Sequence, residues 1–182
     1  MYYGNIKTFD ISNGPGLRVS LYVSGCNHHC KGCFNPETWN FKYGKTFDDD
    51  AMNKIIEASK PSQIVGLTIL GGEPLDPKNQ ETVLKVIKKY KENYKDKTIW
   101  MFSGYVLEDI KKWFDKLPYT KEIIDNIDVL VDGKFVEELK DPELGFRGSS
   151  NQRIIDIKKT LEENKIIYHE KQGNKESRKI WK

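Results

Sequence analysis

Residues 17–33 read LRVSLYVSGCNHHCKGC, a short apolar run followed by three closely spaced cysteines. Residues 17–24 mix β-branched and aromatic side chains and stop at Gly25, which predicts a buried strand, the first of the chain. Cys26, Cys30 and Cys33 therefore occupy a loop that directly follows a strand.

Strand and helix patterns alternate after the cysteine loop. Apolar strands are predicted at 65–70 (VGLTIL), 98–105 (TIWMFSGY) and 127–133 (IDVLVDG). Helices are predicted from Asp48 to Pro61, from about Lys78, over 106–117 up to Pro118, and as one turn over 121–125. This order favours a parallel sheet with right-handed crossovers, in an open or partly closed α/β barrel.

The segment that follows the last of these strands has weaker signals. Residues 141–153 are expected to form a loop, Ile166 to His169 a possible short strand, and the last ten residues a frayed end.

Ligands of open α/β sheets bind beyond the carboxyl ends of the strands. Four segments lie at the carboxyl ends of predicted strands or directly after them, so we expect them to line one rim: the cysteine loop, Gly71–Pro74, Ser103–Gly104 and Asp132–Gly133. This rim is the predicted position of the functional site.

The composition excludes several classes of protein. The chain has 182 residues, 37% of them apolar and 31% charged, which fits one compact domain. It has no long uninterrupted apolar run, so we expect neither a membrane helix nor a secretory signal. Its 30 basic residues nearly balance 27 carboxylates, so the charge does not indicate a nucleic acid partner.

The three cysteines are the only ones in the chain. An odd number within one loop is not a disulfide framework, and an intracellular chain would keep these thiols reduced. Two metal sites remain open. A structural zinc site needs a fourth ligand, for which His28, His29 and His169 are candidates. A four-iron cluster takes one thiolate per iron, so three cysteines leave one iron open.

The motifs and their order resemble those of a known group of enzymes. A C-x3-C-x2-C loop after the first strand and a Gly-Gly-Glu-Pro turn after the next are similar to the radical S-adenosylmethionine superfamily. Further stretches resemble the family of activating proteins of anaerobic ribonucleoside-triphosphate reductases: NGPGLR (13–18), SGCNHHCKGCFNPETW (24–39), TIWMFSGY (98–105), VLVDGKF (129–135) and FRGSSNQRIID (146–156). The superfamily usually has an aromatic residue before the third cysteine, whereas this chain has Gly32 there and Phe34 after it.

The resemblance covers residues 1–157. It implies that they form a radical S-adenosylmethionine core with a partial, open (β/α) barrel, and that residues 158–182 are a lysine-rich C-terminal extension of unknown role. The resemblance further implies that Cys26, Cys30 and Cys33 hold a [4Fe-4S] cluster. S-adenosylmethionine is then expected to contact Gly32, Cys33, Phe34, Gly71, Gly72 and Glu73, with Glu73 accepting a bond from its amine.

The activity implied by the resemblance is oxidoreductive. Such an enzyme uses the cluster and S-adenosylmethionine to generate a glycyl radical on the large component of the anaerobic (class III) reductase, and no side chain acts as acid or base. It implies an electron donor such as flavodoxin, a cytoplasmic location, and neither a nucleic acid nor a membrane partner. Two alternatives stay open: an activating enzyme for another glycyl-radical enzyme such as pyruvate formate-lyase, and a non-enzymatic zinc-binding module.

Other polar and aromatic residues have two possible roles each. We expect His28 and His29 to face solvent. The aromatic residues Trp39, Phe41 and Tyr43 are expected to pack over the cluster, with an exposed docking patch for the partner as the alternative. Ser103 and Asp132 either contact the cofactor or end their strands. Arg18 is a candidate partner for a carboxylate of the cofactor or of another protein, and Arg147 and Arg153 are candidates for planar, multi-donor contacts.

Overall fold

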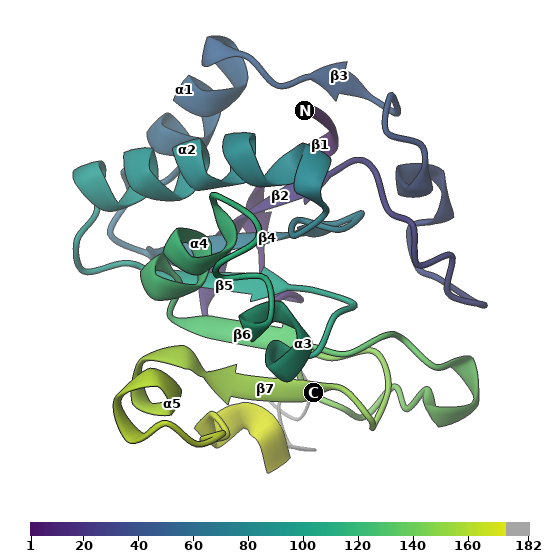
Figure 1. Ribbon diagram of the computed structural model, residues 1–182. Helices are drawn as coiled ribbons and strands as arrows, with labels where there is room; N and C mark the ends of the chain where they lie inside the picture. The colour runs from purple at the N-terminus through teal and green to yellow at the C-terminus, as the bar shows by residue number, and fades with distance from the viewer. Residues whose placement is uncertain (174–182) are drawn as a thin grey trace.

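A computed structural model describes residues 1–173, and in this part of the chain seven strands form one sheet (Figure 1). The order across the sheet is β3-β1-β2-β4-β5-β6-β7. The strands are β1 (Tyr2–Asp10), β2 (Leu17–Val23), β3 (Lys45–Thr46), β4 (Ile64–Gly71), β5 (Thr98–Phe102), β6 (Val129–Asp132) and β7 (Arg153–Asp156). The helices are η1 (Pro36–Trp39), α1 (Asp49–Ala58), α2 (Pro77–Asn93), α3 (Leu107–Lys111), α4 (Thr120–Asn126), η2 (Glu137–Leu139), α5 (Ile157–Glu163) and η3 (Glu170–Gly173).

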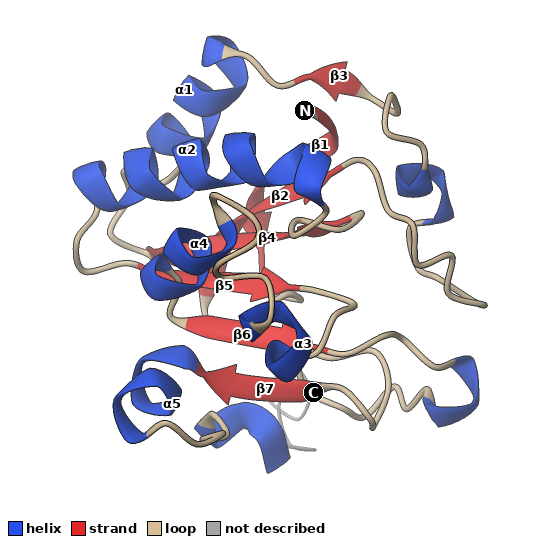
Figure 2. Cartoon of the chain, viewed as in Figure 1, coloured by secondary structure: helices blue, strands red, loops and turns tan. Residues whose placement is uncertain are grey.

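The four central strands β2, β4, β5 and β6 are parallel, as predicted. Antiparallel strands flank them: β1 pairs with β2, β3 with β1, and β7 with β6. The sheet is an open α/β sheet with β3 and β7 at its edges (Figure 2).

The prediction that residues 17–24 form the first strand was wrong, because β1 precedes them. β1 is an edge-side antiparallel strand in which Asn5, Lys7 and Phe9 are exposed, so its sequence lacks the apolar run of a buried strand. The loop predicted over 141–153 ends in β7, whose four residues are too few to give a periodic signal. The strand expected at Ile166 to His169 is reduced to an isolated bridge between Ile155 and Tyr168.

The predicted helices are present, with one shortened. Asp48 caps α1 by accepting a hydrogen bond from the Ala51 amide, as its position before the helix indicates. The helix predicted over 106–117 ends at Lys111. Beyond Lys111 the backbone amides bond to the carbonyls three residues earlier, as in a tighter helical turn. There the Trp113 ring packs against Tyr105, with ring centroids 4.6 Å apart. No helix in the described residues is long and apolar enough to cross a membrane.

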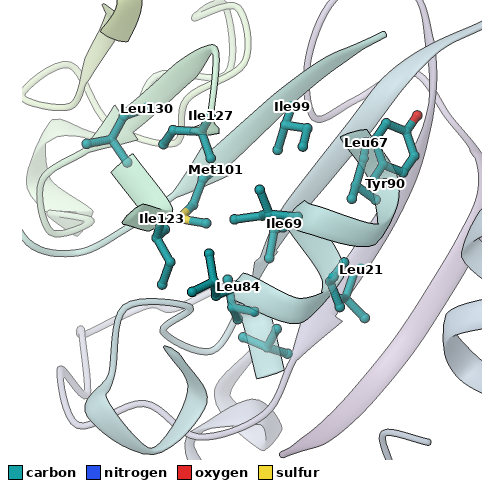
Figure 3. Packing of buried hydrophobic residues seen from close by; sticks show 14 of the residues in the cluster. Leu21, Leu67, Ile69, Leu84, Tyr90, Ile99, Met101, Ile123, Ile127 and Leu130 are labelled. Atoms are coloured by element: carbon teal, nitrogen blue, oxygen red, sulfur yellow. The ribbon is translucent and has the colours of Figure 1, made fainter. Parts of the chain in front are cut away.

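The main core lies between the sheet and the helices. Alternate strand residues such as Leu21, Ile69 and Met101 pack against Leu84 of α2 and Ile123 of α4, and all are buried (Figure 3). α5 contributes Ile157 to the same core and packs onto the sheet. The C-terminal extension expected over 158–182 therefore begins within this helix.

The opposite side of the sheet, the open face, carries a second cluster of buried hydrophobic residues: Trp100, Val129, Val131 and Ile154. Phe146 and His169 cover part of this cluster, and both pack edge-on against Trp100. The short helix η3 packs beside it against β7.

Arg18 lies in the same layer of the open face and is 1% exposed. Its guanidinium donates to Thr68 Oγ1 at 2.8 Å and to the Thr98 carbonyl at 3.0 Å. The suggestion that it pairs with a carboxylate of the cofactor or a partner was therefore wrong.

Candidate functional site

A cavity of about 420 Å³ lies at the carboxyl ends of the parallel strands. Its walls include Cys26, Cys30, Cys33, Phe34, Gly71, Gly72, Glu73, Ser103, Gly104 and Gly133. The predicted rim is confirmed, since all four strand-end segments contribute to one cavity. Gly32 and Asp132 belong to these segments, but neither residue lines the cavity.

The cysteine loop is held by backbone contacts and leaves its thiols free. Gly25 and Cys26 donate their amides to the carbonyls of Thr38 and Trp39 in η1. Cys26 is buried, and all three cysteines are unpaired. The sulfur of Cys26 accepts the His28 amide at 3.5 Å, and that of Cys33 accepts the Asn35 amide at 3.4 Å. Such N–H···S contacts are typical of thiolates that hold iron–sulfur clusters.

Burial raises the pKa of the Cys26 thiol to about 11, and burial with the neighbouring Cys33 also raises the pKa of Cys30. Both thiols are therefore protonated at neutral pH, and a metal must displace their protons to bind. In residues 1–173 no three His, Cys, Asp or Glu side chains are close enough to hold a metal ion together. The fold brings the thiols to one cavity without gathering them around one point.

The turn after β4 is joined to the start of the cysteine loop. Gly71 has φ of 108°, and a Cβ there would lie 2.8 Å from the Val23 carbonyl, so a side chain would be strained. Gly72 donates its amide to Val23 O at 2.7 Å, and Glu73 donates to Gly25 O at 2.8 Å. Two glycines thus bring this turn into contact with the backbone that leads to Cys26.

The carboxylate of Glu73 is buried and fully occupied. It accepts hydrogen bonds from the amides of Leu75 and Gly104, from Ser103 Oγ and from His28 Nε2, all between 2.8 and 2.9 Å. An amine could bond this carboxylate only if one of these donors left.

The prediction for the two loop histidines was half right. His29 faces solvent, whereas the side chain of His28 is 7% exposed because its ring packs against Tyr105 and bonds Glu73. Within the described part of the chain, none of the histidines proposed as a fourth zinc ligand is grouped with the thiols. His28 bonds Glu73, His29 packs against Trp39 with tilted rings, and His169 packs on Trp100. The thiol donors fit a cluster that leaves one iron open better than a closed zinc site.

Comparisons with known proteins agree with this donor set. Residues 12–155 match the family model for a 4Fe-4S single cluster domain. The chain is 46% identical over 157 residues to a protein of Haemophilus influenzae named anaerobic ribonucleoside-triphosphate reductase-activating protein, covering 85% of this chain and 97% of that protein. Proteins with the same name from Escherichia coli and Enterobacteria phage T4 are 40% and 39% identical, covering 85% of this chain and 97% and 93% of their own lengths.

The chain belongs to the family of anaerobic ribonucleoside-triphosphate reductase-activating proteins.

Arg147 and Arg153, for which the sequence predicted planar, multi-donor contacts, form hydrogen bonds with residues of the same chain in this family member. Arg153 binds Asp132 and, through two nitrogens, Glu108, and this contact lowers the pKa of Glu108 to about 2. Asp132 also accepts the Leu107 amide at the start of α3, so it has a structural role. Arg147 donates to the carbonyls of Ser150, Gln152 and Gln172 and also lines the cavity.

Of the three aromatic residues that follow the cysteine loop, one lines the cavity and two lie outside it. Trp39 lines the cavity, as expected, whereas Phe41 packs against Gly25 and Lys78, and Tyr43 is exposed. The expectation that all three cover the cluster was therefore wrong for Phe41 and Tyr43.

Sequence reasoning missed a further set of lining residues that the open face contributes to the cavity. They are Lys7, Tyr22, Phe102, Phe135 and Phe146, and only the two-residue alternation of the strands could have indicated Tyr22 and Phe102.

The cysteine loop also contacts η2 across the cavity mouth. Lys31 forms ion pairs with Glu137 and Glu138, and Gly32 packs against the Glu137 side chain. Phe34 is 58% exposed and stacks on Phe135, with ring centroids 5.0 Å apart. This part of the site is exposed to solvent.

Proposed function

We propose that this protein activates the anaerobic (class III) ribonucleoside-triphosphate reductase by generating a glycyl radical on its large component. When bound at Cys26, Cys30 and Cys33, a reduced [4Fe-4S] cluster would supply the electron for reductive cleavage of S-adenosylmethionine to methionine and a 5′-deoxyadenosyl radical. This radical would take a hydrogen atom from a glycine Cα and become 5′-deoxyadenosine, which would leave the glycyl radical on the reductase. The observation that carries the proposal is the convergence of three free thiols and the Gly71–Glu73 turn on one cavity, in a chain of this family.

The chain's own residues bind, position and shield. Cys26, Cys30 and Cys33 would hold the cluster as thiolates, after loss of their protons. Gly71 and Gly72 leave the turn's backbone open to S-adenosylmethionine, and Cys33 and Phe34 line the cavity beside it. Gly32, which lies outside the lining, would contribute only through the shape of the loop. Trp39, with other aromatic rings of the wall, excludes water, and this protects a radical from side reactions.

The proposal extends to the fold, the location and the electron donor. We propose that the open sheet is a partial (β/α) barrel of the radical S-adenosylmethionine type formed by residues 1–157, which the reductase itself closes. A low-potential one-electron donor such as flavodoxin would reduce the cluster, and an anaerobic cytoplasm would preserve it. The proposal requires neither a nucleic acid nor a membrane, and it gives no role to the extension over 158–182.

Electron paramagnetic resonance of the reductase tests the proposal. The protein is reconstituted anaerobically with iron and sulfide, then incubated with S-adenosylmethionine, dithionite and the reductase, and a glycyl signal is expected on the reductase. A colourless, zinc-loaded product that does not cleave S-adenosylmethionine would overturn the proposal in favour of a zinc-binding module. A glycyl signal on pyruvate formate-lyase and none on the reductase would overturn the choice of partner.

The variant Cys30→Ala is expected to lose the cluster and the glycyl signal while remaining soluble. Cys30 lies outside the hydrophobic core, so its loss removes a ligand without opening a cavity there. Iron content, absorbance and far-ultraviolet circular dichroism measure the two effects separately. An active, iron-loaded Cys30→Ala protein would contradict the ligand role.

A further inference from the structure

His28 connects the cysteine loop to the turn after β4 by a buried contact. Its Nε2–H donates to Glu73 Oε2 at 2.9 Å, and the two side chains are 7% and 1% exposed. His28 lies two residues from Cys26 and two from Cys30, so the contact to Glu73 anchors the loop between these two cysteines. A hydrogen bond to a buried carboxylate is stronger than one between neutral groups.

The ring of His28 lies in a space that β5 and the segment after it provide. It packs edge-on against Tyr105, with ring centroids 4.3 Å apart, and Tyr105 packs in turn on Trp113. A Cβ at Gly104 would collide with the imidazole, so a glycine at this position makes room for the ring. The His28 side chain is therefore enclosed, whereas the neighbouring His29 is exposed.

Glu73 is the point where three segments meet. Its carboxylate accepts one hydrogen bond from its own turn, two from the Ser103–Gly104 segment, and one from His28 of the cysteine loop. A second contact, Asn27 Nδ2 to Asp76 Oδ2 at 2.8 Å, joins the same loop to the residues that follow the turn. Asn27 is exposed, so the His28 contact is the one shielded from water.

We propose that His28 is a positioning residue, which holds the cysteine loop in register with the Gly71–Glu73 turn through the Glu73 carboxylate. The inference rests on the proposed function, in which the loop carries the cluster and the turn receives S-adenosylmethionine. Glu73 then acts by fixing this turn, and its side chain does not bind the cofactor's amine. Loss of His28 leaves three thiols for the cluster but frees the turn to move relative to them.

The test compares His28→Ala, His28→Gln and His29→Ala as anaerobically reconstituted proteins. His28→Ala is expected to keep the iron content of the unmodified protein and to bind S-adenosylmethionine about tenfold more weakly, as loss of a charge-assisted hydrogen bond predicts. S-adenosylmethionine at a concentration that saturates the unmodified protein should then change the paramagnetic spectrum of the reduced cluster less. His28→Gln keeps an N–H donor of similar reach and should restore binding to within about threefold. His29→Ala, the control, should match the unmodified protein.

A measurement on the iron-free proteins separates positioning from direct contact with the cofactor. The amides of residues 26–34 should exchange with deuterium faster in His28→Ala than in His29→Ala, because only the former loses the contact to Glu73. If His28→Ala does not fold, His28→Phe replaces it, since it keeps a ring against Tyr105 and removes the donor.

Two results would overturn the proposal. One is a His28→Ala protein whose cofactor affinity, spectrum and exchange match those of His29→Ala. The other is loss of iron by His28→Ala and His28→Gln alike, which would make His28 a ligand. If the unmodified protein itself forms no cluster or does not bind S-adenosylmethionine, the proposed function fails instead.

Discussion

Arg18 is a buried cation that no carboxylate neutralises within the described residues. Its guanidinium reaches Thr68 on β4, Thr98 on β5 and the Leu67 carbonyl, and it lies over the Trp100 ring at 5.7 Å. Burial lowers the pKa of Arg18 to about 10. The side chain stays charged at neutral pH because it starts from the highest pKa of any residue type, and its planar donors join two neighbouring strands.

We therefore expect Arg18→Lys to destabilise the protein, although it keeps the charge. A lysine ammonium donates from a single point and cannot reach both Thr68 and Thr98, so the free energy of unfolding should fall by about 2–4 kcal/mol. Urea unfolding at pH 7 measures the change. Lys7→Arg, at an exposed position on the neighbouring strand, is the control and should lie within about 0.5 kcal/mol of the unmodified protein. Equal stabilities of the two variants would contradict this role of Arg18.

The residues of the site were predictable where their signal is local. The spacing of Cys26, Cys30 and Cys33, and the two glycines before Glu73, are visible in short stretches of sequence. The burial of His28 was not, because the ring is enclosed by Tyr105 and Glu73, which lie far from it along the chain. Arg18 was misjudged for the same reason, since its partners are on two other strands.

At the scale of elements, Asp128 joins α2, β5 and α5 at the end opposite the cavity. Its carboxylate accepts from Lys91 at 2.8 Å, from Lys158 at 2.6 Å and from the Ile99 amide at 2.7 Å. Burial by itself raises the pKa of Asp128, but these three donors outweigh burial and hold the pKa below its ordinary value of 3.8.

This lowered pKa predicts how stability depends on pH. A carboxyl group with a folded-state pKa below its unfolded value stabilises the protein above pH 4, and this contribution is lost as the pH falls through the folded pKa. We expect Asp128→Asn to lower the free energy of unfolding by about 1–3 kcal/mol at pH 7. The difference between the two proteins should shrink below about pH 4, because there Asp128 takes up a proton in the unfolded chain before it does so in the folded protein.

Urea unfolding at pH 7, 5 and 3.5 measures this dependence. Asp125→Asn is the control, because Asp125 forms a surface pair with Lys121 and should contribute less than about 0.5 kcal/mol. A stability difference for Asp128→Asn that stays constant from pH 7 to pH 3.5 would show that the charge of Asp128 is not its source.

Elements with a strong apolar pattern were predicted well, and edge elements were not. β4 and α2 have strong apolar patterns because neighbours cover them, and their predicted positions agree with the structure. β1 and β7 lie toward the two edges of the sheet, where exposed polar residues or short length weaken the pattern. The sequence could therefore indicate the parallel centre of the sheet but not its antiparallel borders.

For the whole molecule, the two sides of the sheet differ in a way that matters for function. α1, α2, α4 and α5 contribute to the core on one side (Figure 1). On the other side the cavity opens beside the cluster of Trp100, Val129, Val131 and Ile154, and loops form its remaining wall. Under the proposed function, the glycine of the reductase approaches the cysteine loop from the side where the cavity opens.

The proposed function thus predicts where the reductase protects this protein. Hydrogen exchange of the reconstituted protein should slow on addition of the reductase in the cysteine loop and in η2, which meet at the cavity mouth through Lys31 and Glu137. Phe34 and Leu139 are 58% and 43% exposed there, so a partner would bury apolar surface that is now in contact with water. α1 and α2, on the helix-covered side, should exchange at unchanged rates and serve as an internal control. Protection confined to these two helices would mean that the reductase binds away from the cavity, and the open face could not then be the route by which its glycine reaches the site.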